Sequence, residues 1–309
     1  MAKFIKSVLL FIIYSTFGYC ILLTLAGLII PHKYLANLKY KLADTSFTFS
    51  RLEEVKQEEN LDILFLGSSH AYRGFDTRMY TEQGYKTFNL GSSTQTPLQS
   101  KLLLQRYLDR LKPKQIIIEV YPLIFCSDGV ESGLDIISND INDRHSIDMA
   151  VDLNHPLIYH SLLYGSIKDF LGLNRSYSEE KWKAISNYIS GGFVDRQLRY
   201  FNHVEHPKDH WEFHEQQFQH FEEILSILKE KDIDVLLVFA PITKSKYKSY
   251  DNNKDFDIKM KNYGEYYNLH EILALDDSLH FYDSNHLNKL GVKIFNESIM
   301  NLLKANKNQ

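Results

Sequence analysis

Cysteine is nearly absent from this chain. Cys20 and Cys126 are the only two among 309 residues, and Cys20 lies inside an apolar N-terminal segment. Two such distant cysteines exclude a disulfide framework, and neither their number nor their spacing indicates a zinc site. The fold must therefore be stabilised by a hydrophobic core, for which a hydrophobic content of 44% and an aromatic content of 13% are ample.

A surplus of positive charge is also missing. The chain has 35 lysine and arginine residues against 39 aspartate and glutamate residues, which gives a formal net charge of −4. Because a phosphate-binding surface normally has a basic surplus, we expect no nucleic acid partner. We expect neither a metal nor another cofactor: His210 and His214 are four residues apart, but no third ligand has a diagnostic spacing.

Charged residues are missing altogether from Val8 to Ile30. A stretch of this length spans the core of a bilayer as a helix, and Lys3 and Lys6 before it favour a cytoplasmic N-terminus. A cleaved signal peptide is the alternative, although the run is long for one and no clear Ala-x-Ala site follows. We predict a single-pass anchor over residues 1–31 in a bacterial cytoplasmic membrane, with everything after it outside the cytoplasm.

Apolar runs alternate with helical patterns after a charged segment over residues 32–60, which we interpret as a helix or stalk. Strands separated by helices of this length make right-handed crossovers and a parallel sheet. We therefore predict an α/β fold, a three-layer α/β/α sandwich with a five-stranded parallel sheet, over residues 61–309. The predicted strands are Leu61–Gly67, Tyr85–Gly91, Gln115–Tyr121, Asp234–Ala240 and Leu279–Tyr282.

The alternation lapses between residues 125 and 206, where the sequence is polar, aromatic and rich in turns. We interpret this segment as an insertion over the carboxyl edge of the sheet, where lids and substrate loops usually lie. The predicted helices are one capped by Asp76, one from Pro97 to about Leu111, a patch at Leu157–Leu171, one from about Asp209 to Lys231, and one from Lys289 to Lys304.

A candidate nucleophile follows the first predicted strand, in Gly67-Ser68-Ser69-His70. A serine hydroxyl needs exposure and a base within hydrogen-bond reach. Ser69 meets the first condition because Gly67 lets the chain turn sharply at the carboxyl end of the strand. Ser68, one residue earlier, is the rival nucleophile, and a plain turn after a strand is the alternative interpretation.

A candidate base lies near the other end of the chain, in Asp283-Ser-Asn-His286. Asp283 can orient the His286 ring and stabilise the imidazolium that forms when the ring takes a proton. A surface histidine beside a helix cap is the alternative. Taken with Ser69, however, these residues supply the hydroxyl, base and orienting acid of an activated serine nucleophile.

These motifs resemble the blocks of the SGNH (GDSL-type) hydrolase superfamily. Ser69 occupies the place of the nucleophile in the first block, Asn89-Leu-Gly91 resembles the second block, and Asp283-Ser-Asn-His286 resembles the last. The similarity covers residues 61–122 and 234–304. It implies a flavodoxin-like sheet, catalysis by Ser69, His286 and Asp283, and an oxyanion hole formed by the N–H groups of Ser69 and Gly91.

One block of that superfamily is missing. Its third block is usually Gly-x-Asn-Asp, whose Asn donates to the oxyanion, whereas here the third strand continues as Glu119-Val-Tyr121-Pro122. Such a donor contributes about 3 kcal/mol to transition-state stabilisation, so a substitute is needed or the enzyme is slow. Gln95 and Tyr121 are the candidate substitutes. His70 is a candidate substrate contact, with a bond to neighbouring backbone as the alternative.

The Gly-Ser-Ser-His start and the missing Asn resemble a membrane-anchored branch that includes proteins of alginate O-acetylation and of teichoic acid D-alanylation. This resemblance implies acyl transfer to or from a cell-surface polymer, often beside a membrane-bound O-acyltransferase. We expect a membrane-anchored, extracytoplasmic serine esterase or O-acyltransferase that adds or removes acetyl groups on a polysaccharide. The alternatives are a non-catalytic SGNH-like domain that binds polysaccharide or scaffolds an export complex, and a secreted lipase or thioesterase.

Overall fold

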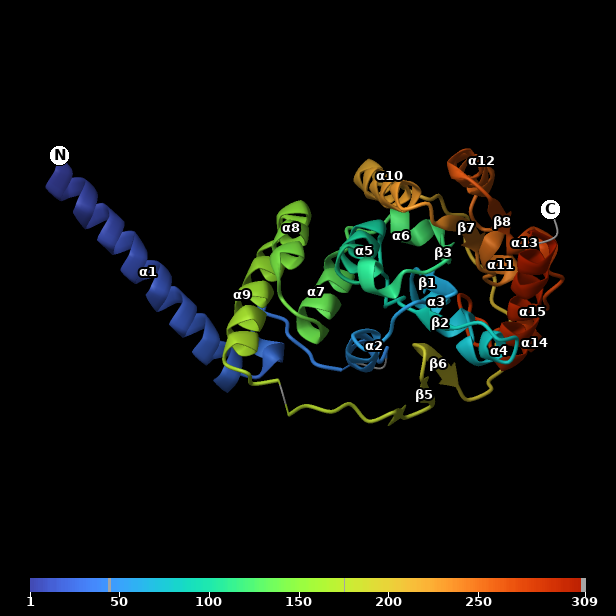
Figure 1. The fold of residues 1–309 in the computed structure, drawn as a ribbon, viewed down its shortest axis with the longest axis horizontal. Helices are drawn as coiled ribbons and strands as arrows, with labels where there is room; N and C mark the ends of the chain where they lie inside the picture. Colours follow the sequence, from blue (N-terminus) through green and yellow to red (C-terminus); the bar gives the residue numbers. More distant parts are fainter. Residues whose placement is uncertain (44–45, 175, 307–309) are drawn as a thin grey trace.

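The computed structural model describes residues 1–43, 46–174 and 176–306 of the chain. A long N-terminal helix, α1, precedes an α/β body (Figure 1). In chain order the elements are α1 (Ala2–Ile29), η1 (His32–Tyr34), α2 (Thr48–Val55), β1 (Ile63–Leu66), α3 (Ser69–Gly74), α4 (Thr77–Thr81), β2 (Thr87–Asn89), α5 (Pro97–Leu111), β3 (Gln115–Glu119), α6 (Pro122–Phe125), α7 (Val130–Asn139), α8 (Arg144–Leu153), α9 (Pro156–Phe170), β4 (Trp182–Lys183), β5 (Ser186–Ile189), β6 (Phe193–Arg196), α10 (Glu215–Glu230), β7 (Asp234–Phe239), α11 (Lys244–Tyr247), α12 (Asn253–Tyr263), β8 (Tyr266–Asn268), α13 (Leu269–Ile272), α14 (Asp277–His280) and α15 (Lys289–Asn306).

The predicted parallel sheet is confirmed. Within the described residues, five strands form it in the order β2-β1-β3-β7-β8, and every adjacent pair is parallel. Leu64 of β1 lies opposite Phe88 of β2 on one side and Ile116 of β3 on the other. The chain leaves β1 for β2 at one edge and later passes to β3 on the other side of β1. The carboxyl ends of β1 and β3 therefore form a topological switch point, where open α/β sheets bind ligands.

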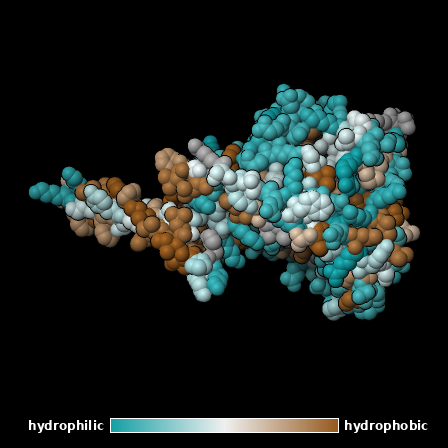
Figure 2. All heavy atoms as spheres, turned by 90° about the horizontal axis from the view of Figure 1, so that it is seen from below, coloured by the Kyte–Doolittle hydropathy of each residue, from teal (hydrophilic) through white to brown (hydrophobic). Residues whose placement is uncertain are grey.

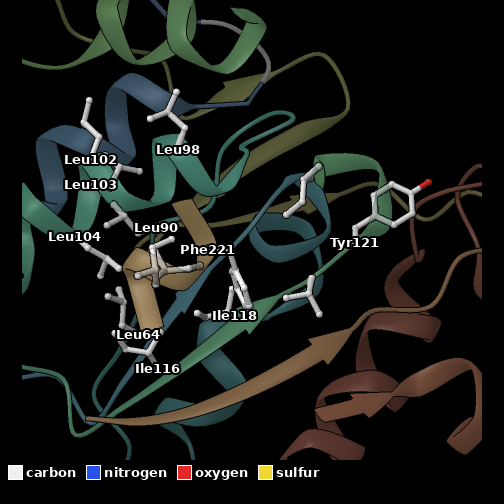
Figure 3. Packing of buried hydrophobic residues seen from close by; sticks show 14 of the residues in the cluster. Leu64, Leu90, Leu98, Leu102, Leu103, Leu104, Ile116, Ile118, Tyr121 and Phe221 are labelled. Atoms are coloured by element: carbon white, nitrogen blue, oxygen red, sulfur yellow. The ribbon is translucent and has the colours of Figure 1, made fainter. Parts of the chain in front are cut away.

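Alternating side chains of the strands pack into two separate cores, which makes three layers. On one face, Leu64 and Ile116 pack with the leucines of α5 and with Phe221 of α10 (Figure 3). On the other face, Phe65 and Ile117 pack with helices α3, α4 and α15. Both faces of a central parallel strand are buried in such a sandwich, which explains its continuous apolar sequence.

The fifth strand was predicted at the wrong place. Residues 279–282 form no strand of the sheet; β8, at Tyr266–Asn268, pairs with β7 instead. Asp276 accepts hydrogen bonds from the N–H groups of Ser278 and Leu279 and so caps the short helix α14. An N-cap of this kind stabilises a helical turn, and Leu279 faces solvent rather than a core.

Helix starts were predicted correctly where a capping signal marks them. Asp76 caps α4, and Pro97 opens α5 behind a capping box of Thr96 and Gln99. The start of α10 was predicted six residues too early, because residues 209–214 are held in extended form against the segment after α11. His210 there bonds to Asp251. His210 and His214 therefore do not share a helical turn, and among the described residues no group of three or more His, Cys, Asp or Glu side chains is arranged to hold a metal.

Part of the predicted stalk is built into the body. Phe47, Leu52 and Val55, in and before α2, are buried. Arg51 of the same helix is fully buried and donates to the carbonyls of Ser46 and Gly192. The second of these acceptors belongs to the insertion, so α2 joins the sheet to the inserted segment.

The insertion has its own architecture. It contains α7, α8 and α9, the last close to the helical patch predicted from Leu157 to Leu171, and a three-stranded antiparallel sheet in the order β4-β5-β6. That sheet, which the sequence did not reveal, packs Tyr188 and Val194 against Tyr72 of α3. The insertion thereby places β6 beside the carboxyl edge of the main sheet.

Helix α1 projects from the body, and hydrophobic side chains cover much of its visible surface (Figures 1 and 2). It is long and apolar enough to cross a membrane, and none of its most apolar 18-residue window is buried. Its C-terminal part lies against α9 in the insertion, where Tyr19 Oη is 2.8 Å from His160 Nε2 and Gly27 lies against the Tyr164 ring. The predicted apolar helix over Val8–Ile30 is therefore present.

Candidate active site

The candidate nucleophile lies in the turn between β1 and α3. Gly67 has a φ of +136°, and Ser68 caps α3 while Ser69 opens it. A Cβ atom on Gly67 would lie 2.7 Å from Cβ of Glu119 on β3, so this close crossing of β1 and β3 requires a glycine. The turn brings Ser69, which is half-buried, to the switch point of the sheet.

Ser69, His286 and Asp283 form a continuous hydrogen-bonded chain, as their sequence motifs predict. Ser69 Oγ lies 2.8 Å from His286 Nε2, and His286 Nδ1 lies 2.9 Å from both carboxylate oxygens of Asp283. Asp283 Oδ1 also accepts the N–H groups of Asn285 and His286, each at 2.8 Å. The hydroxyl, the imidazole and the carboxylate thus have the mutual geometry that an activated serine nucleophile requires.

The electrostatic environment favours neutral His286 beside ionised Asp283. Burial, followed by the nearby charges of Arg73 and His70, lowers the pKa of His286 below its ordinary value despite the hydrogen bond to Asp283. Burial alone would raise the pKa of Asp283, but its bonds to His286 and to backbone N–H groups lower the net value well below that of an ordinary carboxyl. At neutral pH the imidazole can therefore accept a proton at Nε2 while Nδ1–H donates to the carboxylate.

The rival serine has a structural position. Ser68 is buried; its hydroxyl donates to Glu119 Oε2 at 2.9 Å and its N–H to the same oxygen at 3.2 Å. Its hydroxyl oxygen also accepts the N–H of His70 at 3.2 Å. Ser68 therefore ties the turn to Glu119 on β3. Ser69 is the serine whose hydroxyl contacts the imidazole of His286.

Two of the predicted oxyanion donors have other partners. The N–H of Gly91 donates to Asn89 Oδ1 at 3.1 Å, and the side-chain amide of Gln95 donates to Ser100 Oγ at 2.9 Å. Gln95 is fully buried and bonds to α5, because its loop folds back onto that helix. Gly91 has a packing role: a Cβ there would lie 2.9 Å from the carbonyl oxygen of Gly67. The N–H of Ser69 remains a candidate donor, since the first N–H groups of a helix lack partners within it.

Tyr121 and His70 lie beside the site but are buried. The Tyr121 hydroxyl donates to Asn285 Oδ1 at 3.3 Å, and its ring centroid is 4.2 Å from that of His70. Nδ1 of His70 is 3.6 Å from Oε1 of buried Glu119, and the His70 ring meets His286 edge-on. The Tyr121 hydroxyl therefore supports the loop of Asp283 and His286, while His70 packs between the Tyr121 and His286 rings and also lines the small cavity at His286.

Two arginines near the reacting atoms were missed in the sequence. Arg73 Nη1 lies 3.4 Å from His286 Nε2, and Arg196 Nη1 lies 3.8 Å from Asp283 Oδ2. Arg73 follows Ser69 by four residues, and this helical spacing could have placed it on the same face of α3. No sequence pattern around Arg196 indicates its position, because the antiparallel sheet of the insertion, which was not predicted, places it beside Asp283.

Comparisons with known proteins give few matches. No protein-family model matches the chain, and no curated protein matches it. Among solved structures it is similar to a protein from Bacteroides fragilis named as an acylhydrolase, with 10% identity, a TM-score of 0.42, and coverage of 85% of this chain and 99% of that one. It is also similar to a GDSL-like lipase from Bacteroides thetaiotaomicron, with 11% identity, a TM-score of 0.41 and the same coverage.

Replacement of Gly67 by alanine tests the turn. We expect Gly67→Ala to lower the free energy of unfolding by about 3 kcal/mol or more, because it adds a methyl group to a close crossing in a strained backbone conformation. Gly84→Ala is the matched control, since φ there is +83° but no atom lies within 4 Å of the added carbon. It should cost only about 1 kcal/mol. Urea unfolding measures both, and equal losses would contradict the account of the turn.

Proposed function

We propose that this chain is a serine-dependent acyl-transfer enzyme of the SGNH type, an esterase or O-acyltransferase. The observation that carries the proposal is the hydrogen-bonded chain from Ser69 through His286 to Asp283 at the switch point of a parallel sheet. A nucleophile whose base is itself oriented by a third group is the constellation that acyl transfer requires.

The chemistry follows from these positions. Ser69 Oγ attacks the acyl carbonyl while His286 Nε2 takes its proton, and Asp283 stabilises the resulting imidazolium. His286 then gives the proton to the departing alcohol, leaving an acyl group on Ser69. Water or a sugar hydroxyl, deprotonated by the same imidazole, releases that acyl group, so one site serves hydrolysis and transfer alike.

Stabilisation of the oxyanion is the weaker part of this site. The Ser69 N–H is available, whereas the Gly91 N–H donates to Asn89 and no block-three Asn exists. Each missing donor costs about 3 kcal/mol in the transition state, so we expect a slow enzyme on simple esters. The same deficit favours, as the second candidate function, a non-catalytic domain that binds polysaccharide or serves as a scaffold.

The apolar helix α1 supports a membrane-anchored location, and the lysines before it favour an extracytoplasmic body. From the branch resemblance of the motifs we propose an acylated cell-surface or exported polysaccharide as substrate, with acetyl as the acyl group, and the anchored location agrees with such a substrate. A membrane-bound O-acyltransferase is a partner that fits an anchored enzyme of this kind, by the branch resemblance of its motifs.

Single substitutions at the two adjacent serines test the nucleophile. With full-length chain in detergent micelles and 4-nitrophenyl acetate as substrate, Ser69→Ala should lower kcat/KM by about 10³-fold or more, because the nucleophile is lost. Ser68→Ala is the matched control and should lose far less activity than Ser69→Ala, since it removes the hydroxyl bond to Glu119 but keeps the Ser68 N–H bond and the candidate nucleophile. Equal rates for Ser69→Ala and unaltered protein would end the assignment.

The pH profile tests the environment of His286. The base must be neutral to act, and its pKa is lowered from the ordinary 6.5. As the pH falls through 6.5, kcat/KM should therefore stay on its plateau and decline only at more acidic pH. Circular dichroism at each pH controls for unfolding. A decline centred at or above pH 6.5 in folded protein would show that burial and Arg73 do not set the basicity of His286.

A further inference from the structure

Arg73 and Arg196 hold guanidinium groups that the described part of the chain leaves incompletely paired. Nε of Arg73, and Nε and Nη1 of Arg196, are buried without a hydrogen-bond partner among the described residues. Burial first, and then the charge of Arg73, lowers the pKa of Arg196 to about 10, which still leaves it charged at neutral pH. Both arginines are half-buried, and the carboxylate near Arg196 is that of Asp283, 3.8 Å from Nη1 and beyond hydrogen-bond reach. Guanidinium N–H groups that are buried without an acceptor are costly to hold unless an anion joins them.

The other cations of the same region are neutralised. Arg73 and Arg196 line a cavity of about 190 Å³ together with Arg78, Lys289, Asp76 and Asp195. Arg78 forms two hydrogen bonds to Asp76, and Lys289 lies 3.2 Å from Asp195. The remaining cation of the cavity, Lys293, is exposed and lies 4.0 Å from Glu297. Both acids of the cavity are thus already paired. Among the described residues, Arg73 has no carboxylate partner there and Arg196 has only the 3.8 Å contact to Asp283, so the positive surplus lies at these two arginines.

The position of Arg73 indicates which part of the substrate it would contact. In acyl transfer by a serine, the imidazole Nε2 that removes the serine proton later delivers it to the departing alcohol. The alcohol oxygen must therefore approach Nε2 of His286, and Arg73 Nη1 lies 3.4 Å from that atom. A group held by Arg73 would therefore belong to the alcohol partner.

We propose that Arg73 and Arg196 form an anion subsite that binds a carboxylate or phosphate group on the alcohol partner, beside the hydroxyl that carries the acyl group. This inference rests on the proposed function for its orientation and deepens it, because it names an anionic carbohydrate as the substrate class. The planar guanidinium offers paired N–H donors that match both oxyanions. The bound anion would also offset the Arg73 charge that opposes protonation of His286, so binding of the correct substrate would strengthen the base.

Two sugar pairs of matched shape test the proposal on full-length chain in detergent micelles. Calorimetric titration compares glucuronate with glucose, and glucose 6-phosphate with glucose, so that carboxylate and phosphate are distinguished. We expect at least one anion to bind about tenfold more tightly than glucose. Arg73→Gln and Arg196→Gln should each abolish that preference, whereas Arg144→Gln, at a side chain that is 89% exposed, should retain it. Ser69→Ala should also retain it, because the subsite does not include the nucleophile.

Turnover separates this inference from the proposed function. The ratio of kcat/KM for an O-acetylated methyl glucuronide to that for the O-acetylated methyl glucoside should exceed about ten and fall toward one in Arg73→Gln. Anion binding that is no tighter than glucose binding, or that survives both arginine substitutions, would overturn the subsite even if Ser69-dependent turnover occurs. Arginine-dependent anion binding without any Ser69-dependent turnover would instead leave the subsite standing and remove the proposed function.

Discussion

The site depends on the contact between the turn after β1 and the buried carboxylate of Glu119 on β3. Glu119 accepts both the N–H and the hydroxyl of Ser68, and Gly67 permits the approach because it has no Cβ. These bonds tie the start of α3 to the neighbouring strand and compensate part of the cost of burying a carboxylate. Since α3 carries Ser69, His70 and Arg73, this contact helps to position the candidate nucleophile, an aromatic ring and a cation.

The base arrives from the opposite end of the chain, 217 residues from the nucleophile. Its loop is closed by the bond from Tyr282 N–H to His286 O, and the Thr243 N–H and hydroxyl both donate to Ser284 O. The loop after β7 therefore holds the loop of Asp283 and His286 in place. The rigid sheet and these hydrogen bonds thus position the two loops that carry Ser69 and His286.

The sequence predicted the parts of the fold that local patterns encode. The first four strands are apolar runs separated by helical segments. Asp76 and Pro97 mark the starts of helices because a capping side chain and a proline act on the first helical turn alone. Ser69 could be selected because its motif follows β1. Asp283 and His286 were expected after a strand that the sheet does not contain, so it was the Asp-x-x-His motif and its resemblance to the last SGNH block that singled them out. The fold class therefore needed only local patterns and the order of the first four strands, whereas the meeting of the three residues was predicted from the motifs.

What the sequence did not predict depends on contacts between distant segments. The strand at Tyr266–Asn268 is too short to show a period, and it forms because β7 offers a free edge. Arg196 reaches the site only because it lies on β6, in the antiparallel sheet of the insertion. The hydrogen bond from the Gly91 N–H to Asn89 Oδ1 could not be predicted from the motif. Electrostatic properties such as the lowered pKa of His286 arise from Arg73 and from burial, which appear only when α3 and the C-terminal loop meet.

Covalent labelling of the folded, full-length chain shows directly whether His286 activates Ser69. A fluorophosphonate reacts with a serine only where a base activates it, and mass spectrometry of the peptides locates the modified residue. The account predicts one adduct, on Ser69, that is lost in His286→Ala protein of unchanged circular dichroism. An adduct on Ser68, or no adduct on natively folded chain, would contradict the assignment of Ser69 and His286 as an activated nucleophile and its base.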